Sequence, residues 1–261
     1  MVASGMSDQR PAVCVTGGAR RLGAEIARGF GEAGWHVVIH YGSSRDEAEA
    51  LAATLPSAET VQADLKDGDG CVAMVGALAR RLPDWRVLVN NAAIFDADTV
   101  TALDPDTNRL TMEINARTPT RMAQAFLAQA QAAGGRRVIN VTDQKLRNPN
   151  PDFFSYTMSK HALASTIAMQ AKAHARSEDR IYGLAPGAIL PSHDQSEEEA
   201  QVSHRLNLLG RRTGPGEIAR GALFLAEGWL ASGQTLYCDS GQHLLNQPRD
   251  VIYLAREGAR T

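Results

Sequence analysis

A short apolar run, a glycine-rich turn and a helical pattern follow one another near the N-terminus and constrain the fold more than any other feature. The run at 12–16 is typical of a buried strand, and the pattern at 24–33 is typical of a helix. The turn between them contains Gly17 and Gly23. Such glycines let the backbone approach a pyrophosphate, whose charge is met by free N–H groups at the helix start. The segment predicts a phosphate-binding unit, although a plain tight turn also needs glycine.

The same alternation of strand and helix signals continues along the chain without a linker. We predict strands at 12–16, 36–41, 60–63, 87–90, 138–142, 180–184 and 235–238, and helices at 24–33, 45–55, 70–82, 110–133, 154–175 and 215–228. Alternation of this kind implies parallel strands joined by right-handed crossovers. The predicted fold is therefore α/β, a Rossmann-type doubly wound three-layer αβα sandwich. It would form one domain over 11–261, after a disordered tail at 1–10.

Composition agrees with one enzyme-sized domain. The 261 residues suffice for a single large core, and a net charge of −2 provides no field that would draw the protein to nucleic acid or anionic membranes. Three cysteines and seven histidines lack metal-type spacing, so we expect no metal site. No apolar run approaches the roughly 20 residues of a membrane span, and the first residues do not resemble a signal peptide. We therefore expect a cytoplasmic protein.

Tyr156 and Lys160 stand four positions apart inside a predicted helix. At this spacing two side chains share a helix face, so the lysine ammonium can favour the phenolate and lower a pKa that starts at about 10. Such a tyrosine can exchange a proton in carbonyl or imine chemistry. The pair alone is weak evidence, since it also occurs on helices with a half-buried tyrosine and an exposed lysine. Asp143, at the end of a predicted strand thirteen positions earlier, adds weight to it.

Six motifs in order resemble the short-chain dehydrogenase/reductase family over 11–245. They are the turn from Thr16 to Gly23, Asp64-Leu65, Asn90-Asn91-Ala92-Ala93, Asn115, Tyr156 with Lys160, and Pro186-Gly187. The resemblance implies that Lys160 holds the nicotinamide ribose and that Asn115 links it to solvent through a water. It also implies a homotetramer, and a mobile substrate loop at about 190–210.

Two departures from the common family pattern resemble the pteridine reductase branch. Arg21 stands where most members carry glycine, and Asp143 where most carry a catalytic serine. Phe95, shortly after the Asn-Asn-Ala motif, matches a phenylalanine that stacks on the pterin ring, and Phe153 matches an aromatic before the tyrosine. The resemblance thus implies a catalytic set of Asp143, Tyr156, Lys160 and Asn115, and substrate contacts from Arg21, Phe95 and Phe153. Ala93 departs from the branch, where a hydroxyl would help to hold a ligand.

The end of the second predicted strand indicates the cofactor. An acidic residue there would bind the ribose 2′-hydroxyl and repel a 2′-phosphate, but the sequence is Ile39-His40-Tyr41-Gly42-Ser43-Ser44-Arg45. Its donors, with Arg20 or Arg21, suit a phosphate dianion and favour NADPH over NADH; alternatively, the serines only cap the next helix. The predicted cofactor-binding set is Gly17, Arg20, Arg21, Leu22, Gly23, His40, Tyr41, Ser43, Ser44, Asp64, Leu65, Asn90, Ala92, Lys160, Pro186, Gly187 and Ile189.

Three functions remain open at this stage. The first is an NADPH-dependent pteridine reductase acting on a dihydropterin, biopterin-like or dihydrofolate substrate, because a carboxylate at Asp143 accepts hydrogen bonds from pterin N–H groups whereas a serine donates to a ketone. The second is a carbonyl reductase of the same fold. The third is an NADP(H)-binding regulator without turnover, against which the intact Asn115, Tyr156 and Lys160 argue. The C-terminal segment, 246–261, is expected to pack against a neighbouring subunit.

Overall fold

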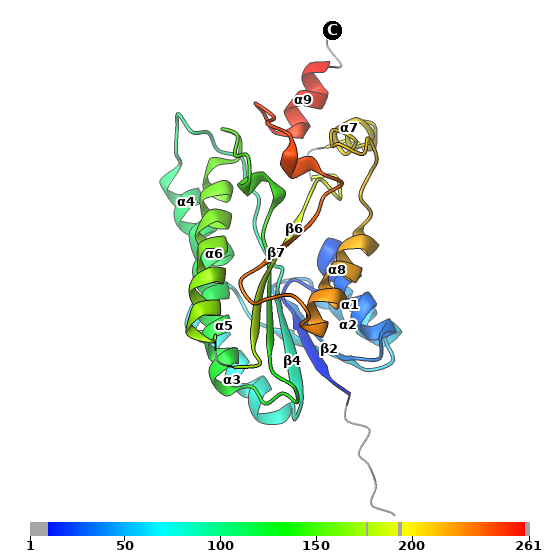
Figure 1. The fold of residues 1–261 in the computed structure, drawn as a ribbon, viewed down its shortest axis with the longest axis vertical. Coiled ribbons are helices and arrows are strands. Elements are labelled where there is room, and N and C mark those ends of the chain that lie inside the picture. The colour runs from blue at the N-terminus through cyan, green and yellow to red at the C-terminus, as the bar shows by residue number, and fades with distance from the viewer. Residues whose placement is uncertain (1–9, 176, 193–194, 259–261) are drawn as a thin grey trace, which may run out of the picture.

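A single seven-stranded sheet forms the centre of the protein (Figure 1). The computed structural model describes residues 10–175, 177–192 and 195–258, so most of the predicted tail lies outside the described residues. All strand pairs are parallel, in the order β3-β2-β1-β4-β5-β6-β7. The strands are β1 Ala12–Val15, β2 His36–Tyr41, β3 Ala58–Gln62, β4 Trp85–Asn90, β5 Arg137–Val141, β6 Arg180–Pro186 and β7 Thr235–Cys238. This arrangement confirms the predicted doubly wound fold.

Helices cover both faces of the sheet (Figure 1). One face carries α3, α4, α5 and α6, and the other carries α1, α2 and α8. The helices are α1 Arg21–Glu32, α2 Arg45–Thr54, α3 Gly68–Arg81, α4 Pro105–Met112, α5 Thr118–Gln129, α6 Phe154–Ala173, α7 Glu197–Ser203, α8 Pro215–Glu227 and α9 Val251–Gly258. None of the helices in the described part of the chain is both long and apolar enough to cross a membrane.

Alternating side chains of the strands build two hydrophobic cores, one on each side of the sheet. In β1, Val13 and Val15 belong to the core under α1 and α8, whereas Cys14 belongs to the core under α3 and α5. Successive side chains of a strand point to opposite faces, so a strand buried on both sides is apolar throughout. The three layers therefore follow from the short apolar runs of the sequence.

The predicted helix at 110–133 is divided into three segments. It begins earlier, with α4 capped by Asp104, continues as a single π-helical stretch, η1 Glu113–Arg117, and ends in α5. Pro119 lacks an N–H and its ring crowds the carbonyl four residues earlier, which disfavours regular α-helix at that point. The wider π turn accommodates this defect and carries Asn115.

Two short helices that the sequence did not predict, α7 and α9, lie together above the carboxyl ends of the strands, at the top of Figure 1. Glu199 of α7 and Arg256 of α9 form an ion pair at 2.8 Å. Ile252 of α9 packs against Phe153 and Tyr156 of the same chain. The segment thus makes contacts within its own chain, and its packing against a neighbouring subunit stays a prediction.

Candidate active site

A cleft of about 770 Å³ opens at the carboxyl ends of the strands, where the strand order reverses beside β1. Ligands of open α/β sheets bind at this position. Most of the predicted site residues line it: Gly17, Arg20, Arg21, Leu22, Gly23, His40, Tyr41, Ser43, Ser44, Asp64, Leu65, Ala92, Phe95, Asp143, Tyr156, Lys160, Pro186, Gly187 and Ile189. Three predicted residues, Asn90, Asn115 and Phe153, do not belong to the described lining.

The glycine turn has the shape of a phosphate cradle. Gly17 has φ +60°, and a Cβ on Gly23 would overlap the carbonyl oxygen of Gly17. The turn is held against the end of β4, because the amide of Asn91 donates to Thr16 O at 2.9 Å and the Thr16 hydroxyl accepts from the Asn91 N–H. Beyond the turn, α1 presents its free N–H groups to the cleft. These features fit a dinucleotide pyrophosphate.

His40 does not provide the phosphate donor that the sequence suggested. Its Nδ1 accepts a hydrogen bond from Gly17 N–H at 3.2 Å, and its Nε2 lies 3.1 Å from the carbonyl oxygen of Ala63. With Nδ1 as acceptor, Nε2 carries the proton and donates it to Ala63. Burial lowers the pKa of His40 to about 4. A neutral imidazole with both nitrogens engaged fixes the glycine turn and leaves no donor for a ligand.

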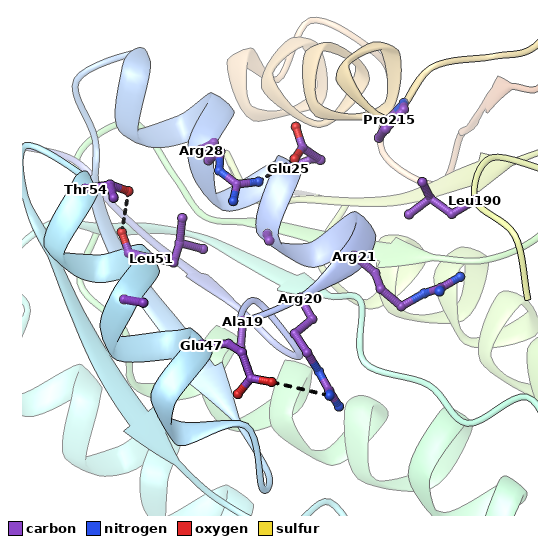
Figure 2. A pocket seen from close by; sticks show the side chains of 12 residues that line it. Ala19, Arg20, Arg21, Glu25, Arg28, Glu47, Leu51, Thr54, Leu190 and Pro215 are labelled. Atoms are coloured by element: carbon purple, nitrogen blue, oxygen red, sulfur yellow. Dashed lines mark hydrogen bonds and ion pairs between the residues drawn. The ribbon is translucent and has the colours of Figure 1, made fainter. Parts of the chain in front are cut away.

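The side chains of Arg20 and Arg21, which were also predicted to bind the phosphate, extend in different directions. Figure 2 shows Arg20 extending toward Glu47, to which it forms an exposed ion pair at 3.5 Å, while Arg21 extends toward the loop after β6. There Arg21 donates to the carbonyl of Pro191 at 2.6 Å. Ser44 precedes α2 without making a side-chain cap, so the alternative of a capping role does not apply to it in the described structure.

The catalytic candidates meet on the substrate side of the cleft. The Tyr156 hydroxyl donates to Asp143 Oδ2 at 2.8 Å, and Asp143 Oδ1 accepts from the Lys145 N–H at 2.8 Å. Lys160 is 3% exposed and donates to the carbonyl of Val141 at 2.7 Å. The three side chains therefore come together as the sequence predicted, with the phenol hydrogen-bonded to the carboxylate.

The electrostatic prediction for Tyr156 was wrong. Burial first, and then the charge and hydrogen bond of Asp143, raise the pKa of Tyr156 well above its usual value. Burial also raises the pKa of Asp143, and lowers that of Lys160 to about 8. Desolvation of the phenolate and the adjacent carboxylate outweigh the neighbouring ammonium. Tyr156 is thus a protonated donor at neutral pH.

Two asparagines that were predicted as site residues, Asn115 and Asn90, lie outside the cleft lining and contact the segments around it. The amide of Asn115 donates to Ile94 O at 2.9 Å and to Ser159 Oγ at 3.1 Å, and its carbonyl accepts from Ile94 N–H. It therefore fixes the segment after β4 against α6, and its water link to Lys160 stays a prediction. Asn90 is buried between the sheet and α5, where its amide donates to Asn140 Oδ1 at 2.8 Å and to the Pro119 carbonyl at 3.3 Å. The next residue, Asn91, contacts the glycine turn in its place.

The predicted substrate aromatics form a stack. The ring of Phe95 lies on that of Phe153, with centroids 4.0 Å apart and planes at 25°, and meets Tyr156 edge to face at 4.6 Å. Phe95 lines the cleft, whereas Phe153 is buried behind it and is followed by Tyr253 at 5.9 Å. Phe153 thus supports the aromatic wall and lies outside the substrate surface.

Comparison with known proteins places this geometry in a family. A family model described as enoyl-(acyl carrier protein) reductase matches residues 17–243. The chain belongs to the short-chain dehydrogenase/reductase family.

Two kinds of family member, proteins named as pteridine or dihydrofolate reductases and a protein named as a ketoreductase, are similar to this short-chain dehydrogenase/reductase. The structure of FolM alternative dihydrofolate reductase 1 from Brucella suis in complex with NADP superimposes with a TM-score of 0.84, at 34% identity over 90% of this chain and 96% of that one. Pteridine reductase 1 of Leishmania tarentolae is 27% identical, covering 91% and 98% of the two chains. The structure of angucycline C-6 ketoreductase LanV with bound NADP has a TM-score of 0.80 at 27% identity, covering 90% and 96%.

Several lining residues of this short-chain dehydrogenase/reductase were missed from sequence. They are Lys145, Gln242, Asp250, Val251 and Ile252, whereas Gln195 and His204 lie within the substrate loop that was expected at about 190–210. The Nδ1 of His204 is buried without a hydrogen-bond partner among the described residues, and burial lowers its pKa to about 4. The missed lining residues come from segments that fold over the cleft only in the tertiary structure.

Among the described residues, no group of three or more His, Cys, Asp or Glu side chains could hold a metal ion.

Proposed function

We propose that this protein is an NADPH-dependent reductase that transfers hydride to a pterin-type substrate, such as a dihydropterin or dihydrofolate. The observation that carries the proposal is the carboxylate of Asp143, which accepts the Tyr156 hydroxyl at 2.8 Å where most family members have serine. A carboxylate accepts hydrogen bonds from the N–H groups of a pterin but offers none to a ketone oxygen unless it is protonated. The pterin reductases among the similar proteins support the same assignment.

The cofactor assignment is supported by the shape and charge of the cleft. The Gly17 turn suits the pyrophosphate, and Arg20, Ser43 and Ser44 supply donors near the expected 2′-phosphate without a competing carboxylate at the end of β2. Lys160 would hold the nicotinamide ribose. NADP in the similar Brucella suis structure is consistent with this choice.

The side chains define a proton path. Bound NADPH supplies the hydride. Tyr156 donates its phenolic proton to the substrate atom beside the reduced carbon, and Lys160, held by the Val141 carbonyl, stabilises the phenolate that remains. Asp143, which accepts the hydrogen bond of the phenol, takes up a proton from solvent after the transfer and relays it to the phenolate, so that both groups return to their starting state. Phe95 provides a flat surface for the ring.

The rate of pterin reduction is expected to fall as the pH rises through about 8. Burial lowers the pKa of Lys160 to about 8, so its ammonium is present below that pH and lost above it, and the neutral amine no longer stabilises the phenolate. The pH profile of kcat/KM measures this effect. Lys160→Arg keeps its charge across the range, so its profile should lack the alkaline fall; an unchanged fall in that variant contradicts the assignment.

Replacement of Asp143 by serine tests the substrate class. Asp143→Ser is expected to lower turnover of a dihydropterin by roughly 10- to 100-fold, the size of a lost charged hydrogen bond. It should raise turnover of simple ketones, since the hydroxyl donates to a carbonyl oxygen. Steady-state rates with both substrates measure the change. Equal pterin rates in the variant and the wild type would contradict a substrate role for the carboxylate.

The proposed function is tested by NADPH oxidation with 7,8-dihydrobiopterin and dihydrofolate beside ethyl acetoacetate and an acetoacetyl thioester. We expect turnover of a pterin, faster with NADPH than with NADH. Turnover of ketones alone would favour the second candidate, a ketoreductase, which the similarity to LanV supports. Binding of NADPH without any turnover would favour the non-catalytic regulator.

We also propose that the protein is cytoplasmic and that it forms a homotetramer. The exposed apolar side chains of Trp229, which is 76% exposed, and Phe224 support an association surface, because they lie edge to face at the end of α8. The mass of the protein in solution, measured by light scattering, distinguishes a tetramer from a monomer.

A further inference from the structure

The C-terminal segment forms part of the wall of the substrate cleft. Asp250, Val251 and Ile252 all line the cleft, although they lie more than ninety residues after Tyr156. Ile252 is buried against Phe153 and Tyr156, next to the ring of Phe95. The catalytic tyrosine is therefore packed against a segment outside the six motifs of the family.

Two polar contacts fix this segment to the loop before α6. Asp152 is buried, and its carboxylate accepts the Arg249 Nε–H at 2.9 and 3.1 Å. The same carboxylate accepts the backbone N–H of Asp250 at 2.8 Å. These contacts hold the side chain of Arg249 and the backbone of Asp250 against Asp152, which fixes the position from which the Asp250 side chain extends.

The carboxylate of Asp250 is itself held at the cleft wall. Its Oδ2 lies 3.2 Å from the ammonium of Lys145, which is 4% exposed and also donates to the Asp152 carbonyl at 2.7 Å. Its Oδ1 accepts the Ile252 N–H at 3.1 Å. Each carboxylate oxygen has two lone pairs, so both oxygens keep acceptor capacity toward the cleft.

Asp250 and Asp143 face the same space. Both line the cleft, and Lys145 joins them, because its backbone N–H donates to Asp143 Oδ1 and its ammonium lies 3.2 Å from Asp250 Oδ2. Of the two lysines on this side, Lys145 uses two of its three ammonium donors on Asp250 and the Asp152 carbonyl, and Lys160 donates to the Val141 carbonyl. A substrate bound between the two aspartates meets hydrogen-bond acceptors on both, so it must itself supply hydrogen-bond donors.

We propose that Asp250 is a substrate-positioning residue, which pairs with Asp143 to select ligands rich in N–H or O–H donors. The inference rests on the proposed function and deepens it: a pterin with amino, ring N–H and side-chain hydroxyl groups satisfies two carboxylates, whereas a simple ketone satisfies neither. A donor-poor substrate would displace water from the remaining lone pairs of both carboxylates without replacing its hydrogen bonds, so the pair discriminates against such substrates.

The experiment compares Asp250→Asn with Glu257→Gln, a matched loss of one carboxylate on the exposed side of α9. For Asp250→Asn we expect the KM for 7,8-dihydrobiopterin to rise roughly tenfold or more, while kcat changes less and the Kd for NADPH is unchanged. Glu257→Gln should behave as the wild type. Asp250→Glu should restore part of the affinity, because it keeps the charged carboxylate with both acceptor oxygens.

A second variant distinguishes an effect on substrate positioning from an effect on the stability of the fold. Asp250→Asn leaves the buried Lys145 ammonium unpaired, which destabilises a protein, whereas the double variant Lys145→Met/Asp250→Asn removes both charges. The raised KM should persist in the double variant. A KM within about twofold of the wild type in both variants overturns the inference alone, provided that the wild type reduces the pterin. A wild type without pterin turnover overturns the proposed function and this inference with it.

Discussion

Tyr156→Phe is expected to lower kcat for pterin reduction by about 10²–10⁴-fold, the usual contribution of a positioned general acid. The change removes only the hydroxyl that donates to Asp143 and leaves the ring packed against Phe95 and Ile252. NADPH binding should therefore persist. Stopped-flow measurement of NADPH oxidation, with a fluorescence titration of NADPH, gives both quantities.

The control for this variant is Tyr237→Phe, the same chemical change on β7 at a tyrosine that stacks on His243 away from the cleft lining. It should retain wild-type turnover. Comparable activity in Tyr156→Phe and the wild type would show that the proton comes from another group, with Asp143 as the nearest candidate.

Gly23→Ala is expected to raise the Kd for NADPH by roughly 10- to 100-fold, corresponding to the 1–3 kcal/mol that overpacking of a tight site costs. The added Cβ would overlap the Gly17 carbonyl and crowd the Asn91 amide, both of which shape the phosphate turn. Fluorescence titration of NADPH measures the loss.

Gly216→Ala provides the matched control. Gly216 lies in the first turn of α8, where a Cβ would meet only the guanidinium of Arg220 at 3.7 Å. This variant should bind NADPH as the wild type does. Unchanged affinity in Gly23→Ala would mean that the turn does not bind the pyrophosphate.

The strands and the strand-end residues could be predicted because their signals are local. A strand buried on both faces is a short apolar run, as at Val13–Val15, and glycine marks the turn that follows. Parallel topology then brings the strand ends together, so residues as distant as Gly17 and Asp143 were correctly placed in one cleft.

The parts that escaped prediction depend on tertiary contacts. The docking of α9 rests on Asp152 and Lys145, about a hundred residues before it, and no local pattern shows that partnership. The spacing of Tyr156 and Lys160 placed an ammonium near the phenol, but the tyrosine pKa is governed by burial and by Asp143. Asn91 lines the cleft in place of the predicted Asn90, since alternation directs the Asn90 side chain to the α5 face of the sheet and the Asn91 amide contacts the glycine turn.

The most direct test of the central claim follows the hydride itself. The protein is incubated with 7,8-dihydrobiopterin and NADPH deuterated at the reactive C4 position of the nicotinamide, and the product is analysed by mass spectrometry. We predict a tetrahydropterin that carries one deuterium on a ring carbon, and no such product with Tyr156→Phe over the same period. Oxidation of the cofactor without deuterium in the pterin, or deuterium transfer only to ketones, would contradict pterin reduction by this protein.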